Sequence, residues 1–315
     1  MRDLFKLAIV ITLFAACNQQ KKATANFTEQ DSTSSSHSQQ EQISLITDSI
    51  GVSRSDSLAD VLVSVDWPKD EKLPLADSVR LYICKELVRV PSKKAKVKAA
   101  SNGSLFVKTT VDSLYQELAA DLKNGEGFRE PGMVFSCSLR VFKLEESDHY
   151  VTYMSNSEGF TGGAHGYATS TGVTFRKSDG KRIGYDMVID MDNEETPWIL
   201  KNQHLFLDPS SQELHRIIKE GVRSYFAQFE TDVLTDENLS DMLIGVDDVN
   251  NIPLPTYPPY FTAKGLCFSY QQYDIAPYAA GMPSFIVPYE KIAPLLTKEA
   301  KELIPNHHNT QKQQK

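Results

Sequence analysis

The sequence predicts an α+β fold, in which an antiparallel or mixed sheet is packed by several helices and follows a disordered N-terminal segment. Two patterns carry this prediction: apolar residues recur at helical spacing in some stretches and alternate with a period of two in others. The two kinds of stretch come in blocks and not in strict β-α-β alternation, which favours an α+β arrangement. The 315 residues are 41% hydrophobic and 23% charged, an ordinary globular composition.

Four stretches have the apolar spacing of amphipathic helices. They cover residues 77–90, 110–122, 211–229 and 289–304. Asp77 and Asp112 stand where helix N-caps are expected, because a short carboxylate side chain accepts hydrogen bonds from the first free N–H groups. Asn124 and Gly125 form a typical helix end after the second stretch.

Strand-like alternation accounts for most of the remaining folded chain. It covers residues 58–67, 133–142, 150–154, 173–175, 261–270 and 284–287. Residues 252–259 contain four prolines and are expected to form a rigid loop. We expect a small α+β module over residues 58–130 and a larger α+β domain over residues 131–305, followed by a disordered tail over residues 306–315.

The first 17 residues have the features of a secretory signal: two early basic residues, a short apolar core, and small residues before Cys17. Phe14-Ala15-Ala16-Cys17 resembles a bacterial lipobox, in which the cysteine becomes the first mature residue and carries acyl chains such as palmitate. Each buried CH₂ contributes about 0.8 kcal/mol, so several chains would hold the protein on a membrane. The alternative is an ordinary signal peptide with an incidental cysteine.

Residues 18–57 are rich in Gln, Ser and Thr and poor in apolar residues, which predicts a disordered tether. Three triplets, Asp31-Ser32-Thr33, Asp48-Ser49-Ile50 and Asp56-Ser57-Leu58, resemble Bacteroidetes O-glycosylation sites, and the sequence leaves open whether they are used. The residues just after Cys17 are not acidic, so we expect a lipoprotein of the outer membrane that faces the periplasm. Exposure on the cell surface is the alternative.

Charge and motif content exclude several function classes. With 33 Lys and Arg against 41 Asp and Glu, the chain has a formal charge of −8 and lacks the basic surface of a nucleic-acid binder. No nucleophile motif, metal-ligand spacing or phosphate-binding loop is present, so we predict no enzyme activity, no metal and no cofactor. Cys84, Cys137 and Cys267 lie in apolar contexts and are expected to be buried free thiols.

Two motifs stand out as candidate binding loops. In the first, Gly162 and Gly163 precede His165, and the glycines permit a tight turn that presents the imidazole. In the second, Tyr273, Asp274 and Tyr278 surround a proline, which makes a rigid aromatic loop. Tyrosine is favoured at protein and glycan interfaces because one end is apolar and the other polar. The alternative for both loops is an architectural role, with their side chains packed on the sheet.

The stretches that contain these motifs, residues 153–166 and 268–281, resemble the envelope domain called domain of unknown function 3298. That domain forms the extracellular part of RsiV-type anti-sigma factors. The resemblance covers about residues 131–305, while residues 58–130 more weakly resemble domain of unknown function 4163. One departure is Asp274, where the family motif has Glu.

The resemblance implies a non-catalytic envelope protein that binds a protein ligand such as lysozyme, or peptidoglycan. We expect the ligand at a rim formed by His165, Gly162 and Gly163 together with Tyr273, Asp274 and Tyr278. A structural or assembly lipoprotein is the first alternative, and an envelope hydrolase that uses His165 is the second. The sequence leaves open the ligand, the membrane leaflet and the oligomeric state.

Overall fold

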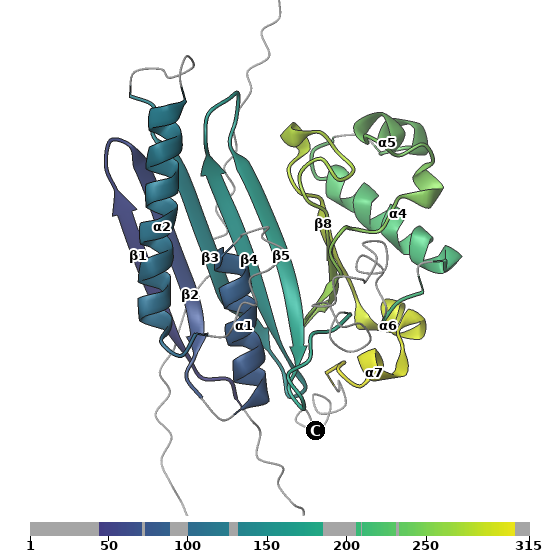
Figure 1. The fold of residues 1–315 in the computed structure, drawn as a ribbon. Helices are drawn as coiled ribbons and strands as arrows, with labels where there is room; N and C mark the ends of the chain where they lie inside the picture. The colour runs from purple at the N-terminus through teal and green to yellow at the C-terminus, as the bar shows by residue number, and fades with distance from the viewer. Residues whose placement is uncertain are drawn as a thin grey trace, which may run out of the picture. The chain divides into compact units, whose positions relative to one another are not determined.

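The computed structural model describes residues 44–70, 73–88, 100–125, 132–184, 206–208, 210–230 and 233–305. Within these residues the chain forms a five-stranded mixed sheet, a three-stranded antiparallel sheet and six helices (Figure 1). The predicted α+β class is therefore confirmed. The predicted signal peptide, most of the predicted tether and the predicted C-terminal tail lie outside the described residues.

The larger sheet has the strand order β1-β2-β3-β4-β5. Its strands are β1 (Thr47–Ser55), β2 (Ala59–Pro68), β3 (Phe135–Glu146), β4 (Tyr150–Phe160) and β5 (Tyr167–Arg176). All neighbouring pairs are antiparallel except β2 and β3, which run parallel. A parallel pair needs a long crossover connection, and α1 (Pro74–Val88) and α2 (Gly103–Asn124) lie in that connection.

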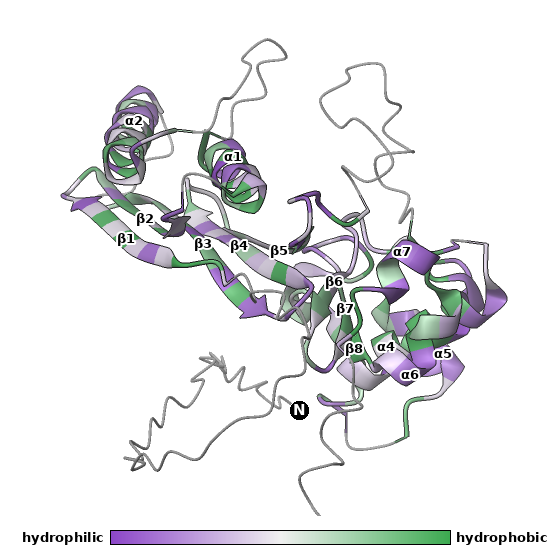
Figure 2. Cartoon of the chain, turned by 90° about the horizontal axis from the view of Figure 1, so that it is seen from below, coloured by the Kyte–Doolittle hydropathy of each residue, from purple (hydrophilic) through white to green (hydrophobic). Residues whose placement is uncertain are grey.

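The two helices cover one face of this sheet (Figure 2). Alternate residues of β2, namely Val61, Val63 and Val65, point to that face and are at most 2% exposed. Full burial of such a side chain contributes about 1.5–3 kcal/mol to stability. The opposite face carries the other set of residues, many of them Ser, Asp or Gly in β1 and β2.

A second hydrophobic core lies around the smaller sheet. That sheet consists of β6 (Tyr260–Thr262), β7 (Gly265–Ser269) and β8 (Ser284–Val287), and the surrounding helices are α4 (Gln212–Phe226), α5 (Asp236–Met242), α6 (Tyr289–Ile292) and α7 (Lys298–Lys301). The apolar stripe of α4 packs into this core, which confirms the predicted helix. Its N-cap is Ser211, whose hydroxyl accepts a hydrogen bond from the N–H of Leu214.

The second core packs on one end of the face of the larger sheet that α1 and α2 do not cover, called the open face below. The hydroxyl of Thr152 donates to the Phe261 carbonyl at 2.8 Å, and the Phe261 N–H donates to the Thr174 hydroxyl at 2.9 Å. Met154 packs with Tyr260 in a small apolar cluster beside these bonds. The second core does not cover the other end of the open face, where the groove described below lies.

The folded region begins before Leu58, so the predicted tether is too long. Leu45 is fully buried, and Thr47–Ser55 form β1 against β2. The tether prediction failed here because β1 has only two apolar side chains, Ile50 and Val52, and β2 supplies the surface on which they pack. Ser49 therefore lies in a strand, with its hydroxyl bonded to the Asp66 carboxylate at 2.6 Å.

A partly buried ionic cluster fixes the start of this segment. Glu146 accepts hydrogen bonds from the Leu45 N–H at 2.8 Å and from the Lys143 ammonium at 2.8 Å, and it pairs with Lys177 at 2.7 Å. Lys143 also donates to the Leu45 carbonyl at 2.9 Å. Burial raises the pKa of the Glu146 carboxyl, but these hydrogen bonds outweigh it and hold that pKa below its ordinary value.

The predicted domain boundary at 130/131 passes through one sheet. Residues 59–65 of β2 pair with residues 135–141 of β3, so the segments on either side of the boundary share a sheet and a core. A connection of more than 60 residues separates these strands in sequence, and periodicity alone does not reveal such pairing. In the structure, residues 44–184 supply most of the first core and residues 206–305 most of the second.

Several element ends also differ from the prediction. The N-cap of α2 is Asn102, while Asp112 lies inside the helix and pairs with Arg54; Asp77 lies in the first turn of α1. The predicted strand 261–270 is a hairpin, because β6 and β7 reverse direction around Ala263 and Lys264. The predicted helix 289–304 is broken into α6, a 3₁₀ turn with Pro294, and α7.

Candidate functional site

Two loops that are distant in sequence meet at one end of the larger sheet. The imidazole of His165, between β4 and β5, stacks on the ring of Tyr278 with centroids 3.9 Å apart and planes inclined by 21°. The Tyr273 ring lies 6.1 Å from that of Tyr278. The structure therefore brings together the two motifs that the sequence singled out.

Both nitrogens of His165 have partners. Nδ1 lies 2.8 Å from the Gly166 carbonyl oxygen, and Nε2 lies 3.2 Å from the Tyr273 hydroxyl. A carbonyl oxygen only accepts, so Nδ1 donates to Gly166, while Nε2 lies within hydrogen-bonding distance of the tyrosine hydroxyl. These contacts fix the orientation of an exposed imidazole.

The histidine loop depends on its glycines. Gly162 and Gly163 have φ values of 96° and 89°, in a region that residues with a Cβ rarely adopt. They turn the chain after β4 so that His165 reaches across to Tyr278. Gly162 and Gly163 thus position the loop through their backbone, and we assign them no direct ligand contact.

The aromatic loop is held by its own hydrogen bonds. The Gln271 N–H donates to the Asp274 carboxylate at 2.8 Å, and the Asp274 N–H donates to the Gln271 carbonyl at 3.1 Å. Asp274 therefore closes a tight turn and points into its own loop, unlike the exposed Tyr273 beside it. The Tyr225 hydroxyl fixes the far side of the loop by donating to the Ala280 carbonyl at 2.7 Å.

A groove on the open face of the larger sheet runs up to this stack. Its volume is about 500 Å³. Strand residues form its floor, and Gly166 and Tyr278 lie at its edge; the residues that line it are Asp60, Leu62, Ser136, Cys137, Ser138, Arg140, Glu158, Gly159, Phe160, Gly166, Tyr167, Ala168 and Tyr278. The floor mixes polar side chains with apolar ones such as Leu62 and Phe160, because the helices cover only the other face of these strands.

Three charged side chains line the groove without a partner among the described residues: Asp60, Arg140 and Glu158. They come from β2, β3 and β4, respectively. Arg140 lies two residues along β3 from Ser138, which pairs with Glu158 of β4. No motif in the sequence singles them out. The signal that could have found Arg140 is its place in the alternation of residues 133–142, where it is the one charged residue on the polar face.

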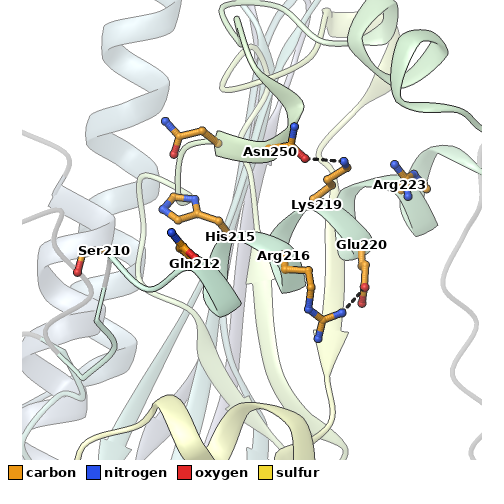
Figure 3. A pocket seen from close by; sticks show the side chains of 9 residues that line it. Ser210, Gln212, His215, Arg216, Lys219, Glu220, Arg223 and Asn250 are labelled. Atoms are coloured by element: carbon orange, nitrogen blue, oxygen red, sulfur yellow. Dashed lines mark hydrogen bonds and ion pairs between the residues drawn. The ribbon is translucent and has the colours of Figure 1, made fainter.

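A larger pocket, of about 610 Å³, lies on the outer side of α4 (Figure 3). Its charges neutralise one another: Arg216 pairs with Glu213 and Glu220, and both Lys219 and Arg223 pair with Asp236. The hydrogen bond from Lys219 is the main reason why the pKa of Asp236 is lowered. Since these groups are already paired, we place the candidate site in the sheet groove.

The remaining predicted residues are distributed as follows. Cys17 lies outside the described residues, whereas Cys84, Cys137 and Cys267 are free and buried, as predicted. Burial raises the pKa of Cys84 and Cys267, which keeps both thiols protonated at neutral pH. Among the described residues no cluster of His, Cys, Asp or Glu could hold a metal ion, and no helix is long and apolar enough to cross a membrane.

Two solved structures share the fold. One is a DUF3298 family member from Bacteroides fragilis, with a TM-score of 0.59 and 19% identity over 82% of this chain and 95% of that one. The other is a DUF3298 family protein from Pseudomonas aeruginosa, with a TM-score of 0.52 and 18% identity over 84% of this chain and 99% of that one. No curated protein matches the sequence.

A family model described as "Protein of unknown function (DUF3298)" matches residues 203–290. The match covers α4, the smaller sheet and the aromatic loop, and it starts later than the resemblance at residue 131 suggested. The resemblances of residues 58–130 to domain 4163, and of the chain to RsiV-type proteins, stay predictions. The chain is thus similar to the DUF3298 family over residues 203–290, and it shares the fold of two solved members of that family.

Proposed function

We propose that this protein is a non-catalytic cell-envelope lipoprotein that binds peptidoglycan fragments in the sheet groove beside His165 and Tyr278. The observation that carries the proposal is the stack of these two rings at the edge of a groove with unpaired charges. Binding sites typically combine an apolar or aromatic wall with a few polar groups that fix the orientation of the ligand.

The chemistry of the groove suits a peptidoglycan fragment. Its amino sugars present apolar faces that stack on aromatic rings, and its stem peptides carry both carboxylates and amino groups. Arg140 offers a cation for a carboxylate, while Asp60 and Glu158 offer anions for an amino group. The hydroxyls of Ser136 and Ser138 add donors and acceptors for sugar hydroxyls.

The surroundings of His165 favour binding over hydrolysis. A histidine base is normally oriented by a carboxylate at Nδ1 and faces a nucleophile at Nε2. Here the partners are the Gly166 carbonyl and the Tyr273 hydroxyl, which hold the imidazole in place as part of a wall. The alternative in which His165 serves an envelope hydrolase has no such support.

The proposed anchor is an acylated Cys17, which would attach the protein to the outer membrane so that it faces the periplasm. This part rests on the signal-like segment and on Phe14-Ala15-Ala16-Cys17. The described chain starts at the end of the sheet that carries Leu45 and Glu146, while the groove lies toward the other end of the same strands.

Calorimetry of the full chain in detergent, titrated with soluble muropeptides, tests the proposal. We expect binding by the wild type and about tenfold weaker binding by Arg140→Gln, because a hydrogen bond to a charged group contributes about 1.5–3 kcal/mol. The matched control is Arg216→Gln, which removes an exposed arginine from the α4 pocket and should leave the affinity unchanged.

The same titration separates the alternatives. If Arg216→Gln weakens binding and Arg140→Gln does not, the ligand occupies the α4 pocket and the groove assignment is wrong. Heat with a lysozyme and none with muropeptides would identify a protein ligand in place of a glycan. No heat with either would favour the structural or assembly role.

A further inference from the structure

Strand β1 presents an open hydrogen-bonding edge. Its even-numbered residues bond to β2, as shown at the two ends by Lys69 N–H to Ile46 O (2.9 Å) and Asp56 N–H to Ala59 O (3.0 Å). In an antiparallel ladder the alternate residues point the other way. The outward groups therefore belong to Thr47, Ser49, Gly51, Ser53 and Ser55, and within the described chain nothing bonds to their backbone.

The opposite edge of the same sheet is closed. The Ala168 N–H of β5 donates to the Gln272 side chain at 3.1 Å, and the Ser170 N–H and carbonyl both bond to the Gln271 side chain. Further along β5, the Ile183 N–H donates to the Thr174 carbonyl at 2.8 Å. Proteins usually block free strand edges against pairing with another chain. In this sheet the β5 edge is blocked, whereas the β1 edge is free within the described chain.

We propose that two copies of this chain associate through β1, paired antiparallel about a two-fold axis at Gly51. The five outward residues are symmetric about this position, because 47 and 55, and 49 and 53, lie at equal distances from 51. The pairing would form about ten backbone hydrogen bonds, two for each outward pair. An interface of this kind uses the same surface on both copies.

In this register, the side chains of the even-numbered β1 residues in one copy face complementary side chains in the other copy. Asp48 lies opposite Arg54 of the second copy, and Ile50 lies opposite Val52 of the second copy. These are non-hydrogen-bonded pairs, at which cross-strand side chains come closest. Within one copy Asp48 pairs with Lys69 and Arg54 with Asp112, but all four side chains are 41–59% exposed and can share a further partner.

The charges select this register over its neighbours. A shift of the axis by one residue, to Ile50 or Val52, places Asp48 opposite Val52 or Asp56 of the second copy. Neither arrangement forms a charge pair at that position, and like charges opposite each other are destabilising. The favoured occupant of the edge is therefore a second copy in the Gly51 register.

Disulfide trapping in the full chain tests the pairing. Gly51→Cys puts a thiol on the proposed axis, and a Cβ there meets only the Ser64 Cβ, at 4.0 Å, so the variant should fold. Hydrogen-bonded antiparallel partners have Cα atoms about 5.5 Å apart, within the span of a disulfide. The matched control is Ser64→Cys, one strand further in on each copy, where the two Cα atoms would be roughly 15 Å apart.

We expect an oxidised dimer band for Gly51→Cys on non-reducing gels, above the background of the wild type, and none for Ser64→Cys. Charge reversal then tests the register: Arg54→Asp in the Gly51→Cys background should reduce trapping about tenfold, because two attractive pairs become repulsive. The further change Asp48→Arg restores opposite charges across the axis and should restore trapping. Equal bands for Gly51→Cys and Ser64→Cys would overturn the proposal, and so would trapping that is insensitive to Arg54→Asp.

Discussion

Replacement of Tyr278 by Ala should weaken ligand binding while it leaves the fold almost intact. The Tyr278 ring is half-buried, its main aromatic contact is the His165 stack, and its hydroxyl has no hydrogen-bond partner in the described chain. An aromatic pair contributes about 0.5–1.5 kcal/mol. We therefore expect a loss of about 1 kcal/mol in unfolding free energy, which corresponds to roughly 2–4 °C in melting temperature for a domain of this size.

Tyr270, in the same part of the chain, supplies a matched comparison. It is fully buried, and its hydroxyl donates to the Pro253 carbonyl at 2.8 Å. Tyr270→Phe loses that hydrogen bond, at a cost of about 1 kcal/mol, so its stability loss should resemble that of Tyr278→Ala. Tyr270→Ala leaves a cavity and should cost about 3–5 kcal/mol.

The assay combines thermal unfolding with muropeptide calorimetry on four variants, two at Tyr278 and two at Tyr270. Tyr278→Ala should weaken binding by tenfold or more, which is about 1.4 kcal/mol, whereas Tyr270→Phe should bind as the wild type does. Tyr278→Phe should keep the wild-type melting temperature because its hydroxyl bonds to no described group. The reasoning is refuted if Tyr278→Ala unfolds as early as Tyr270→Ala and still binds normally. In that case the two loops lock the sheet and bind nothing.

Three further predictions concern the start of the chain and its ionic cluster. Cys17→Ser should release the protein from membranes, and a variant that stays there with its acyl label would contradict lipidation. Limited proteolysis should trim the chain to about residue 44, where the buried Leu45 begins the fold; a stable fragment that starts after β1 would be the opposite result. Glu146→Gln should lower stability at neutral pH by about 1–3 kcal/mol. Because the folded pKa of Glu146 is lowered, this contribution is present above the ordinary value of 4.5 and is lost as the pH falls through the folded pKa. Urea unfolding of both proteins between pH 3 and 7 measures it, and a difference that does not shrink toward pH 3 would contradict the assignment.

The sequence predicted the elements whose own side chains create a strong period. The valines of β2 and the apolar stripe of α4 are such cases, since each faces a core along its whole length. β1 was missed because its only apolar side chains are Ile50 and Val52, and it becomes a strand by pairing with β2. The last helix was predicted as continuous because its apolar spacing persists across Pro294, which breaks it.

For the candidate site, the sequence identified the two loops but not their geometry. His165 and Tyr273 are 108 residues apart, and only the packing of the smaller sheet on the larger one brings them together. The role of Asp274 as a turn-closing residue depends on bonds to Gln271 that no spacing rule specifies. Arg140 and Glu158 emerge as site residues only after the register of β3 with β4 is known.

The ionic cluster around Glu146 also determines how the protein would carry a mechanical load. A pull on the chain N-terminal to Ser44 enters at Leu45, which Glu146 and Lys143 hold through two hydrogen bonds. If the opposing pull comes from a ligand in the groove, the force runs along the strands from one end of the sheet to the other. Because ladder bonds lie perpendicular to the strands, such a force shears the β1–β2 bonds together and does not open them one by one. The arrangement would let a protein tethered at its N-terminal end resist tension on its ligand.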